Sequence, residues 1–188
     1  MLRFSSSGHV ISPLLSPLRR SLYKDLAKAG AGASGIICDV RSDTVTTPTK
    51  GMYEAMQSAR VGDDVFREDP TTKELETKVA DLCGHEAGLF CASGTMTNQL
   101  AMRTHLRPLE SAVIDHRGHV MVHEAGGVAY HSQGTMFPLV PRPGFNHITA
   151  DLVEENLVLP GDVHDAPTRV VCMENTLLGM VLPLDHIQ

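Results

Sequence analysis

The sequence predicts an α/β fold in which a largely parallel sheet lies between helices. Short apolar runs alternate along the chain with segments of helical periodicity, and turn residues separate the two kinds of segment. With 188 residues, 42% of them hydrophobic and 20% charged, the chain has the ordinary composition of a globular protein with one core. We expect residues 36–188 to form the folded part, and residues 1–35 to form a disordered or targeting segment.

Four apolar runs are expected to be buried strands, because each is too short for an ordinary helix and is bounded by turn or polar residues. They are residues 36–40, 87–91, 112–114 and 170–173. Helix signals fall between these runs. Helices are expected from Thr47-Pro48 to Gly62, from the capping-box pattern Thr71-x-x-Glu74 to Gly84 with a stripe of Leu75, Val79 and Leu82, directly after Ser93-Gly94-Thr95, near residues 119–124, and after Thr149.

The first 24 residues differ in composition from the rest of the chain. They hold four basic residues and no acidic one, and they are rich in Ser and Leu. This composition is typical of a mitochondrial transit peptide. Pro13 and Pro17 would interrupt any helix here, so a disordered tail is the alternative. The sequence therefore predicts a mitochondrial or a cytosolic protein.

The charge balance argues against nucleic acid as a partner. The chain has a net charge of −6, and beyond residue 24 it carries 12 basic and 22 acidic residues. Nucleic-acid phosphates need basic side chains to neutralise them. The longest apolar run is also far too short to span a bilayer. We therefore expect neither nucleic acid nor a membrane as the partner.

Ser93-Gly94-Thr95 has the residue types of an anion site. The tripeptide lies between an expected strand and an expected helix. Free backbone N–H groups and the macrodipole at a helix N-terminus attract an anion, and a glycine lets the backbone approach it closely. A phosphate would suit this turn. The alternative is an ordinary helix cap, since Ser and Thr cap helices generally.

Histidines are concentrated between residues 116 and 131. His119 and His123 would share a helix face, which is one requirement of a metal site and of a metal-dependent hydrolase. No matching third ligand is evident, and we predict no metal site. A second interpretation is that one flat imidazole stacks on an aromatic ring. For His116 and His131 we predict a surface position.

Five segments together resemble the motifs of threonine aldolases, in the same order and spacing. The segments are VRSDTVTTPTKGM, VGDDVFREDPTTKELE, CASGTMTNQL, HVMVHEAGG, and ENT followed by VLPL. The resemblance covers residues 37–188. It implies part of the large domain of an aspartate-aminotransferase-like (fold type I) pyridoxal 5′-phosphate enzyme. It also implies retro-aldol cleavage of threonine or allo-threonine to glycine and acetaldehyde, by a dimer or tetramer with active sites at subunit interfaces.

The resemblance implies specific roles for several residues. Ser93, Gly94 and Thr95 would hold the cofactor phosphate, in agreement with the anion-site interpretation, and His119 would stack on the pyridine ring. Ser42 would bind the substrate carboxylate, and Glu124 would orient the histidine region. Phe66 stands in the substrate pocket where the family usually has Tyr. His164 matches a histidine near the substrate hydroxyl. His119 and His164 are both candidates for the base, because an imidazole titrates near neutral pH.

Some features of the family are missing from these residues. The five lysines are Lys24, Lys28, Lys50, Lys73 and Lys78, whereas the family's Schiff-base lysine follows the ENT motif. We therefore expect an incomplete large domain, without its C-terminal part, that is inactive alone. The alternative is a non-catalytic truncated isoform that acts only by binding a partner subunit.

Overall fold

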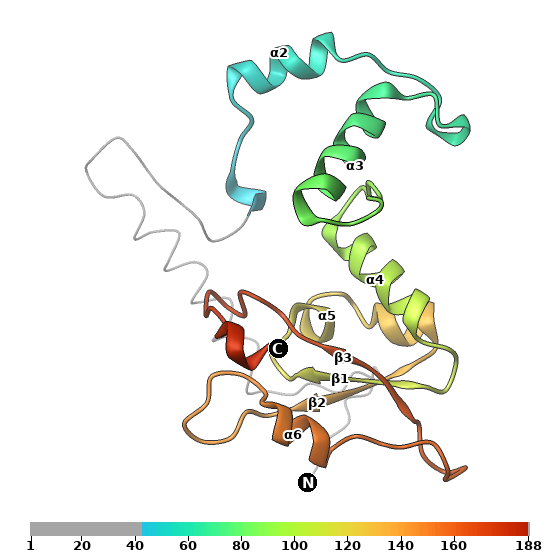
Figure 1. Cartoon of the computed structure of the whole chain (residues 1–188), viewed down its shortest axis with the longest axis vertical. Helices are drawn as coiled ribbons and strands as arrows, with labels where there is room; N and C mark the ends of the chain where they lie inside the picture. The colour runs from blue at the N-terminus through green and yellow to red at the C-terminus, as the bar shows by residue number, and fades with distance from the viewer. Residues whose placement is uncertain (1–42, 188) are drawn as a thin grey trace, which may run out of the picture. The chain divides into compact units, whose positions relative to one another are not determined.

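A computed structural model of the chain describes residues 43–187. The expected strand at residues 36–40, the segment 1–35 and Ser42 lie outside the described residues, so those predictions are not tested. The chain divides into two compact units, Met1–Thr71 and Thr72–Gln188, which are described separately below. Figure 1 shows the elements of both units in chain order.

The first unit contains the helix α2 (Lys50–Ser58) and two 3-10 turns, Asp43–Val45 and Asp64–Phe66. Helix α2 begins two residues after the predicted Thr47-Pro48, because the Thr49 hydroxyl accepts a hydrogen bond from Met52 N at 3.3 Å and caps the helix. It ends at Ser58, so the prediction that Gly62 ends it is wrong. Gly62 instead donates its N–H to Asp69 Oδ2 at 3.0 Å within the following loop.

Helix α3 (Pro70–Cys83) begins with a proline at its first position, where no backbone N–H is needed. Thr71 therefore lies inside the helix, and its hydroxyl donates to Arg60 O at 2.6 Å, so the predicted capping box is wrong. Gly84 ends the helix as predicted. Its φ of 68° is left-handed, and the His85 N–H donates to Ala80 O at 2.9 Å. The helix buries Glu76 and Ala80, whereas the predicted stripe Leu75, Val79 and Leu82 is exposed.

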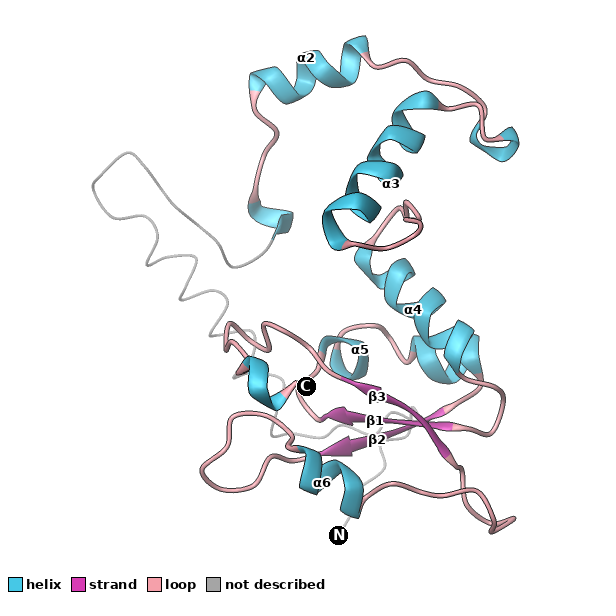
Figure 2. Cartoon of the chain, in the orientation of Figure 1, coloured by secondary structure: helices cyan, strands magenta, loops and turns pink. Residues whose placement is uncertain are grey.

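The second unit is built on a three-stranded parallel sheet, shown in magenta in Figure 2. The strand order is β2-β1-β3. The parallel pairing confirms the predicted α/β class. The strands are β1 (Ser111–Asp115), β2 (Thr135–Leu139) and β3 (Thr168–Cys172), and the helices are α4 (Gly94–His105), α5 (His119–Val122), α6 (Ala150–Glu155), a π-turn Val128–Ser132 and a 3-10 turn Leu184–His186.

All five residues of β1 are buried, as expected for a central strand of a parallel sheet. Helix α4 and the π-turn pack over one face of this strand. Met102 and Leu106 from the helix side contact Ala112 and Val128, and Val120, Met136 and Val170 complete this core. The strands predicted at residues 112–114 and 170–173 are therefore confirmed as β1 and β3, with small shifts of their ends.

Two predicted elements differ from the structure. Residues 87–91 do not form a strand: Leu89 and Phe90 are exposed, and the Phe90 N–H donates to Glu76 Oε1 at 2.9 Å instead of to a neighbouring strand. Strand β2 was not predicted, because Pro138 interrupts its apolar pattern. At the edge of the described sheet this proline is tolerated, since its missing N–H removes no central ladder bond.

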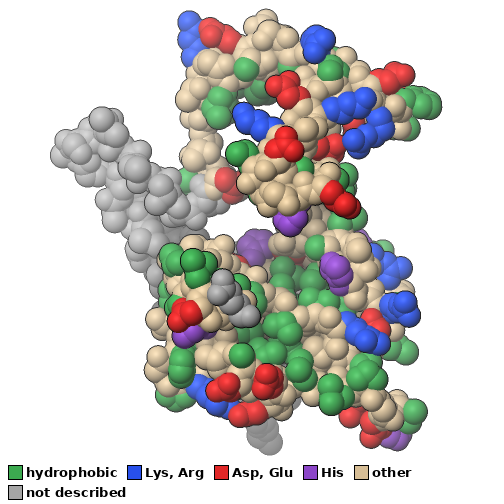
Figure 3. Space-filling model, in the orientation of Figure 1, with side chains coloured by type: hydrophobic (Ala, Val, Ile, Leu, Met, Phe, Trp, Pro, Cys, Tyr) green, Lys and Arg blue, Asp and Glu red, His purple; other side chains and the backbone are tan. Residues whose placement is uncertain are grey.

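Helix α6 begins after Thr149, as predicted, although the Thr149 side chain makes no capping bond. The second unit also exposes apolar side chains, which gather in the middle of the view in Figure 3. Val140, Leu159 and Val171 are among the exposed large residues. Within residues 43–187, no helix has the length and apolar character needed to cross a membrane.

The segment after β3 contains a tight turn from Leu177 to Met180. Leu177 and Met180 exchange both backbone hydrogen bonds, at 3.1 and 3.0 Å. Leu178 and Gly179 have φ of 51° and 83°, the pattern of a type I′ turn. Leucine is poorly suited to the first of these left-handed positions, because its Cβ crowds the following carbonyl oxygen.

We predict that Leu178→Asn raises the free energy of unfolding by about 1 kcal/mol, since Asn tolerates the left-handed conformation. Urea unfolding of the two proteins measures the change. Leu178→Ala is the control: it also shortens the exposed side chain, but it lacks the polar group that lets Asn hydrogen-bond locally in the left-handed conformation. Equal stabilities for the Asn and Ala variants would contradict a backbone cause.

Candidate functional site

The N-terminus of α4 forms the predicted helix start. Ser93 is the N-cap residue, in an extended conformation, and its Oγ accepts a hydrogen bond from Met96 N at 3.1 Å. Gly94 and Thr95 are the first two helical residues. Their N–H groups have no acceptor within the helix itself, which is the property that anion sites use. A Cβ added at Gly94 would meet nothing within 4 Å, so the space beside this helix start is open.

A buried carboxylate, Glu124, accepts hydrogen bonds from the next turn of this helix. The Glu124 side chain is fully buried and accepts hydrogen bonds from Asn98 Nδ2 and Gln99 Nε2, both at 2.6 Å. Its Oε1 is also 2.9 Å from His119 Nδ1. Burial raises the pKa of the Glu124 carboxyl, whereas the bonds from Asn98, Gln99 and His119 lower it, and the net pKa lies below its ordinary value. Glu124 is therefore a carboxylate at neutral pH.

This carboxylate determines the tautomer of the neutral His119 ring. An ionised carboxylate can only accept, so Nδ1 of His119 carries a hydrogen, and in the neutral ring Nε2 then holds the lone pair. The side chain is half exposed, which leaves the ring accessible. The His123 ring lies 5.3 Å away, centroid to centroid, and is tilted by 50°.

The turn that leads from β1 to His119 is fixed by an ion pair. Arg117 donates from its backbone N and its Nε to Asp115 Oδ1, each at 2.9 Å, and from one terminal nitrogen to Asp115 Oδ2 at 2.8 Å. The same guanidinium donates to Asn146 O at 2.7 Å. Burial raises the pKa of the Asp115 carboxyl and the Arg117 bonds lower it, with a net decrease. The charged pair thus holds the loop immediately before α5.

These contacts bring two predicted parts of the site together. Asn98 is three residues after Thr95 and four after Gly94, so it lies on the same face of α4 as the helix start. Through Asn98 and Glu124, His119 is therefore connected to the face that carries the expected anion site. Ser93, Gly94, Thr95, His119 and Glu124 form one continuous group of residues.

His164 does not join this group. It lies in an exposed turn two residues before Ala166, whose carbonyl accepts from Ser111 Oγ at 2.9 Å. Ser111 begins β1, whereas His119 follows the other end of that strand. The two ends of a five-residue strand are about 13 Å apart. The two candidate bases therefore lie at opposite edges of the sheet, as the loop before β3 and α5 do in Figure 1.

The remaining predicted residues are placed as follows. Phe66 is exposed at the end of a 3-10 turn in the first unit, and Ser42 is outside the described residues, so their predicted substrate-binding roles are not tested. His116 and His131 are exposed, which confirms their predicted surface position. In residues 43–187, no cluster of three His, Cys, Asp or Glu side chains has the arrangement of a metal site.

The sequence analysis gave no role to three residues of the site. Asn98 and Gln99 are polar residues of α4 within the segment CASGTMTNQL, which was interpreted only for its anion motif and its family resemblance. Glu174 directly follows the expected strand at residues 170–173, and its Oε2 accepts the His119 N–H at 2.6 Å. Gly127 is also involved, because a Cβ there would lie 2.6 Å from Gln99 Cδ.

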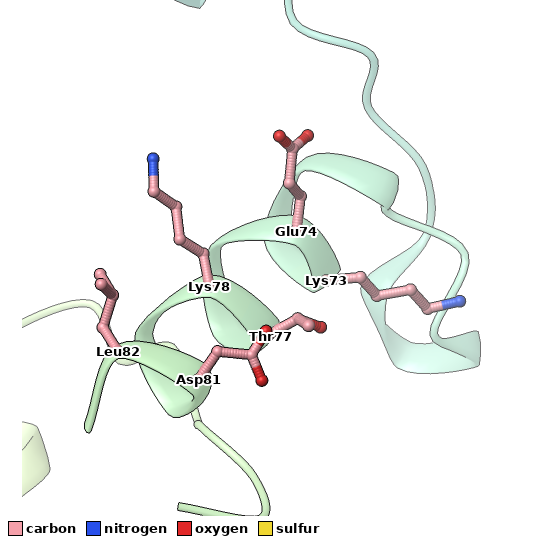
Figure 4. Close-up of a pocket in the computed structure, with 6 residues that line it drawn as sticks. All are labelled: Lys73, Glu74, Thr77, Lys78, Asp81 and Leu82. Atoms are coloured by element: carbon pink, nitrogen blue, oxygen red, sulfur yellow. The ribbon is translucent and has the colours of Figure 1, made fainter. Parts of the chain in front are cut away.

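A separate hollow of about 560 Å³ lies along α3. Lys73, Glu74, Thr77, Lys78, Asp81 and Leu82 line it, and all six come from that one helix. Figure 4 shows Lys73 and Lys78 pointing in different directions. Ligand sites are concave and have convergent polar groups, so this surface is not a candidate.

Comparison with known proteins identifies the family. A sequence profile described as Beta-eliminating lyase matches residues 39–188. The chain belongs to this family. The predicted resemblance to threonine aldolases is also confirmed, because the similar proteins include low-specificity L-threonine aldolases of Eremothecium gossypii (46% identity over 165 residues) and Saccharomyces cerevisiae (49% over 151 residues). The aligned regions cover 87% and 79% of this chain, and 42% and 39% of those two proteins.

A protein with another name and a solved structure are also similar to this chain. The alanine racemase TOXG of Cochliobolus carbonum is 39% identical over 80% of this chain and 39% of its own length. A solved structure of Leishmania major threonine aldolase aligns at a TM-score of 0.40 and 25% identity, covering 45% of this chain and 24% of that one. This member of the Beta-eliminating lyase family spans about two fifths of the length of the two relatives from Eremothecium gossypii and Saccharomyces cerevisiae.

We predict that Glu124→Gln lowers the free energy of unfolding by about 3 kcal/mol at pH 7, because three donors lose a charged acceptor. The folded-state pKa is lowered, so this contribution is fully present above the ordinary value of 4.5 and is lost as the pH falls through the folded value. The difference between variant and wild type should therefore shrink on acidification.

Urea unfolding of both proteins across a pH series tests this prediction. Glu54→Gln is the matched control, since Glu54 forms only an exposed pair with Lys50 at 3.5 Å. Its effect should stay small throughout. A pH-independent loss in Glu124→Gln would show that the carboxylate charge is not the cause.

Proposed function

We propose that the chain forms the phosphate-binding and histidine-bearing part of a pyridoxal-phosphate-dependent threonine aldolase, a carbon–carbon lyase. The supporting relatives are the threonine aldolases at 46% and 49% identity. The main structural support is the connection from the α4 N-terminus through Asn98 and Glu124 to His119. This connection links the helix start that we propose as the phosphate site to an oriented imidazole.

The residues present fit the proposed cofactor. A phosphate suits the N–H groups of Gly94 and Thr95 and the hydroxyls of Ser93 and Thr95, and the open space at Gly94 admits it. The half-exposed His119 ring offers a flat surface to an aromatic ring. When bound, pyridoxal phosphate supplies an electron sink for the electron pair left by Cα–Cβ cleavage.

His119 is the base that we propose for the β-hydroxyl proton. Its Nε2 is the ring nitrogen with a free lone pair, because Nδ1 donates to Glu124. Glu124 holds the Nδ1 proton and stabilises the positive charge that the ring gains when Nε2 accepts a proton. His164 is less suited, because it lies at the other edge of the sheet. Ser42 and Phe66 remain predicted substrate-binding residues.

We also propose that the whole enzyme has threonine aldolase activity and assembles as a homo-oligomer. In these 188 residues no lysine follows Lys78. We therefore propose that the chain alone binds the cofactor without turning over substrate.

We predict that Gly94→Ala weakens cofactor binding and leaves folding intact. The added methyl group has room in the protein but occupies the space proposed for the phosphate. Pyridoxine 5′-phosphate is the probe, since it lacks the aldehyde that reacts with surface lysines. We expect the wild-type chain to bind it more tightly than pyridoxine, and the variant to lose about tenfold in affinity or more.

Gly127→Ala is the contrasting variant. Its methyl group would collide with Gln99, so it should lower the unfolding temperature, whereas Gly94→Ala should not. Equilibrium dialysis and thermal unfolding separate the two effects. Equal affinity of the wild-type chain for pyridoxine and its phosphate would contradict the proposed phosphate site.

A further prediction concerns catalysis by the 188-residue chain. Incubated with allo-threonine and pyridoxal phosphate, it should release no acetaldehyde above the rate without protein, because no lysine follows Lys78 in these 188 residues. A full-length relative from yeast serves as the positive control for the acetaldehyde assay. Turnover at ordinary enzymatic rates, about 1 per second or more, would refute this prediction.

A further inference from the structure

We infer that Glu174 is a positioning residue that fixes the main chain at His119 and thereby orients the imidazole; this inference rests on the function proposed above. The Glu174 Oε2 atom accepts the His119 backbone N–H at 2.6 Å, across 55 residues of sequence. His119 is the first residue of α5. A carboxylate at this position satisfies an N–H group that the helix leaves unpaired, and it also complements the helix dipole.

Helix α5 needs a capping group from elsewhere in the chain. Its own N-cap residue is Gly118, which has no side chain to accept a bond. A larger residue would have to displace its neighbours, because a Cβ at Gly118 would lie 2.9 Å from Ile114 Cδ1 and 3.1 Å from Asp115 O. The close packing on β1 thus disfavours Ser, Thr, Asp or Asn, the usual capping residues. Glu174 supplies the missing acceptor.

The topology of the sheet brings Glu174 to this position. Strands β1 and β3 are parallel neighbours, and Ile114 pairs with Cys172. The carboxyl ends of both strands therefore meet at one edge of the sheet. His119 follows β1 by a short turn, and Glu174 lies two residues beyond the end of β3. The short loops after β1 and β3 thus bring the His119 N–H and the Glu174 carboxylate into contact.

The two carboxylates hold His119 at different points. Glu174 fixes the backbone nitrogen, and Glu124 fixes Nδ1 of the ring at 2.9 Å. With both ends held, rotation about the two side-chain torsions is restricted and Nε2 keeps one direction. The nearby Cys172 thiol supports this arrangement, since burial and then the charges of Glu174 and Glu124 raise its pKa.

A single turn of helix is not stable without such contacts. Helix α5 has only four residues, far fewer than an isolated helix needs in water. Loss of the Glu174 carboxylate should therefore loosen the first residue of the turn. The His119 ring would then leave Glu124 part of the time, and both tautomers of the imidazole would become populated.

Nuclear magnetic resonance of the 15N-labelled 188-residue chain tests the inference without cofactor. The readouts are hydrogen exchange of the His119 amide and the 15N shifts of its ring, which report the tautomer. In Glu174→Ala we expect amide exchange about tenfold faster and a mixture of tautomers. In Glu174→Gln the amide oxygen still accepts, so exchange should change less and the Nδ1–H tautomer should persist.

Glu110→Ala is the matched control. Glu110 is also a carboxylate bonded to a backbone N–H, that of Arg107 at 2.8 Å, but it precedes β1 at the opposite edge of the sheet. Its removal should leave the His119 signals unchanged.

Unchanged His119 signals in Glu174→Ala, with or without a fall in unfolding temperature, would overturn the inference. If Glu174→Ala does not fold, the other two variants decide. Loss of the Nδ1–H tautomer of His119 to the same extent in Glu174→Gln and in Glu110→Ala would also overturn the inference. Failure of the wild-type chain to bind pyridoxine 5′-phosphate would refute the proposed function alone, since the ring readout needs no ligand.

Discussion

The arrangement of the second unit depends on the buried carboxylate of Glu124. A charge out of water is costly unless it is paired and hydrogen-bonded, and here Asn98, Gln99 and His119 all donate to it. These donors come from α4 and α5, so the need to satisfy one carboxylate joins both helices. Removal of any donor would leave part of the charge unpaired, which makes the group of residues cooperative.

Small residues make these approaches possible. Gly127 leaves room for the Gln99 side chain, and Gly118 lets the turn after β1 pack against Ile114. At both positions a Cβ would come closer than 3 Å to a neighbouring atom. Neither contact is visible in the sequence, where the glycines look like ordinary turn residues. Their importance comes from what lies opposite them in the fold.

Some local signals were predicted correctly, although the capping box at Thr71 and the end of α2 at Gly62 were not, and the non-local contacts were not predicted. The start of α4 at Ser93, the end of α3 at Gly84 and the buried run in β1 each depend on residues within one turn or strand. Residues 87–91 have the composition of a strand but lack a pairing partner among the described residues, and an extended segment becomes a strand only when another strand accepts its hydrogen bonds. Strand β2 shows the opposite. Pro138 interrupts its apolar pattern, but the segment still pairs as a strand because a proline is tolerated at the edge of the sheet.

The sequence by itself determined the family, through the order of five motifs, and the start of α4 at Ser93, because a helix cap is encoded by adjacent residues. Only the tertiary structure decided which histidine accompanies that helix. The bonds that orient His119 join residues 5 and 55 positions apart, and those that fix Glu124 span 25 and 26. Parallel strands bring the loops after β1 and β3 to one edge of the sheet and leave His164 at the opposite edge. No local sequence pattern predicts this arrangement.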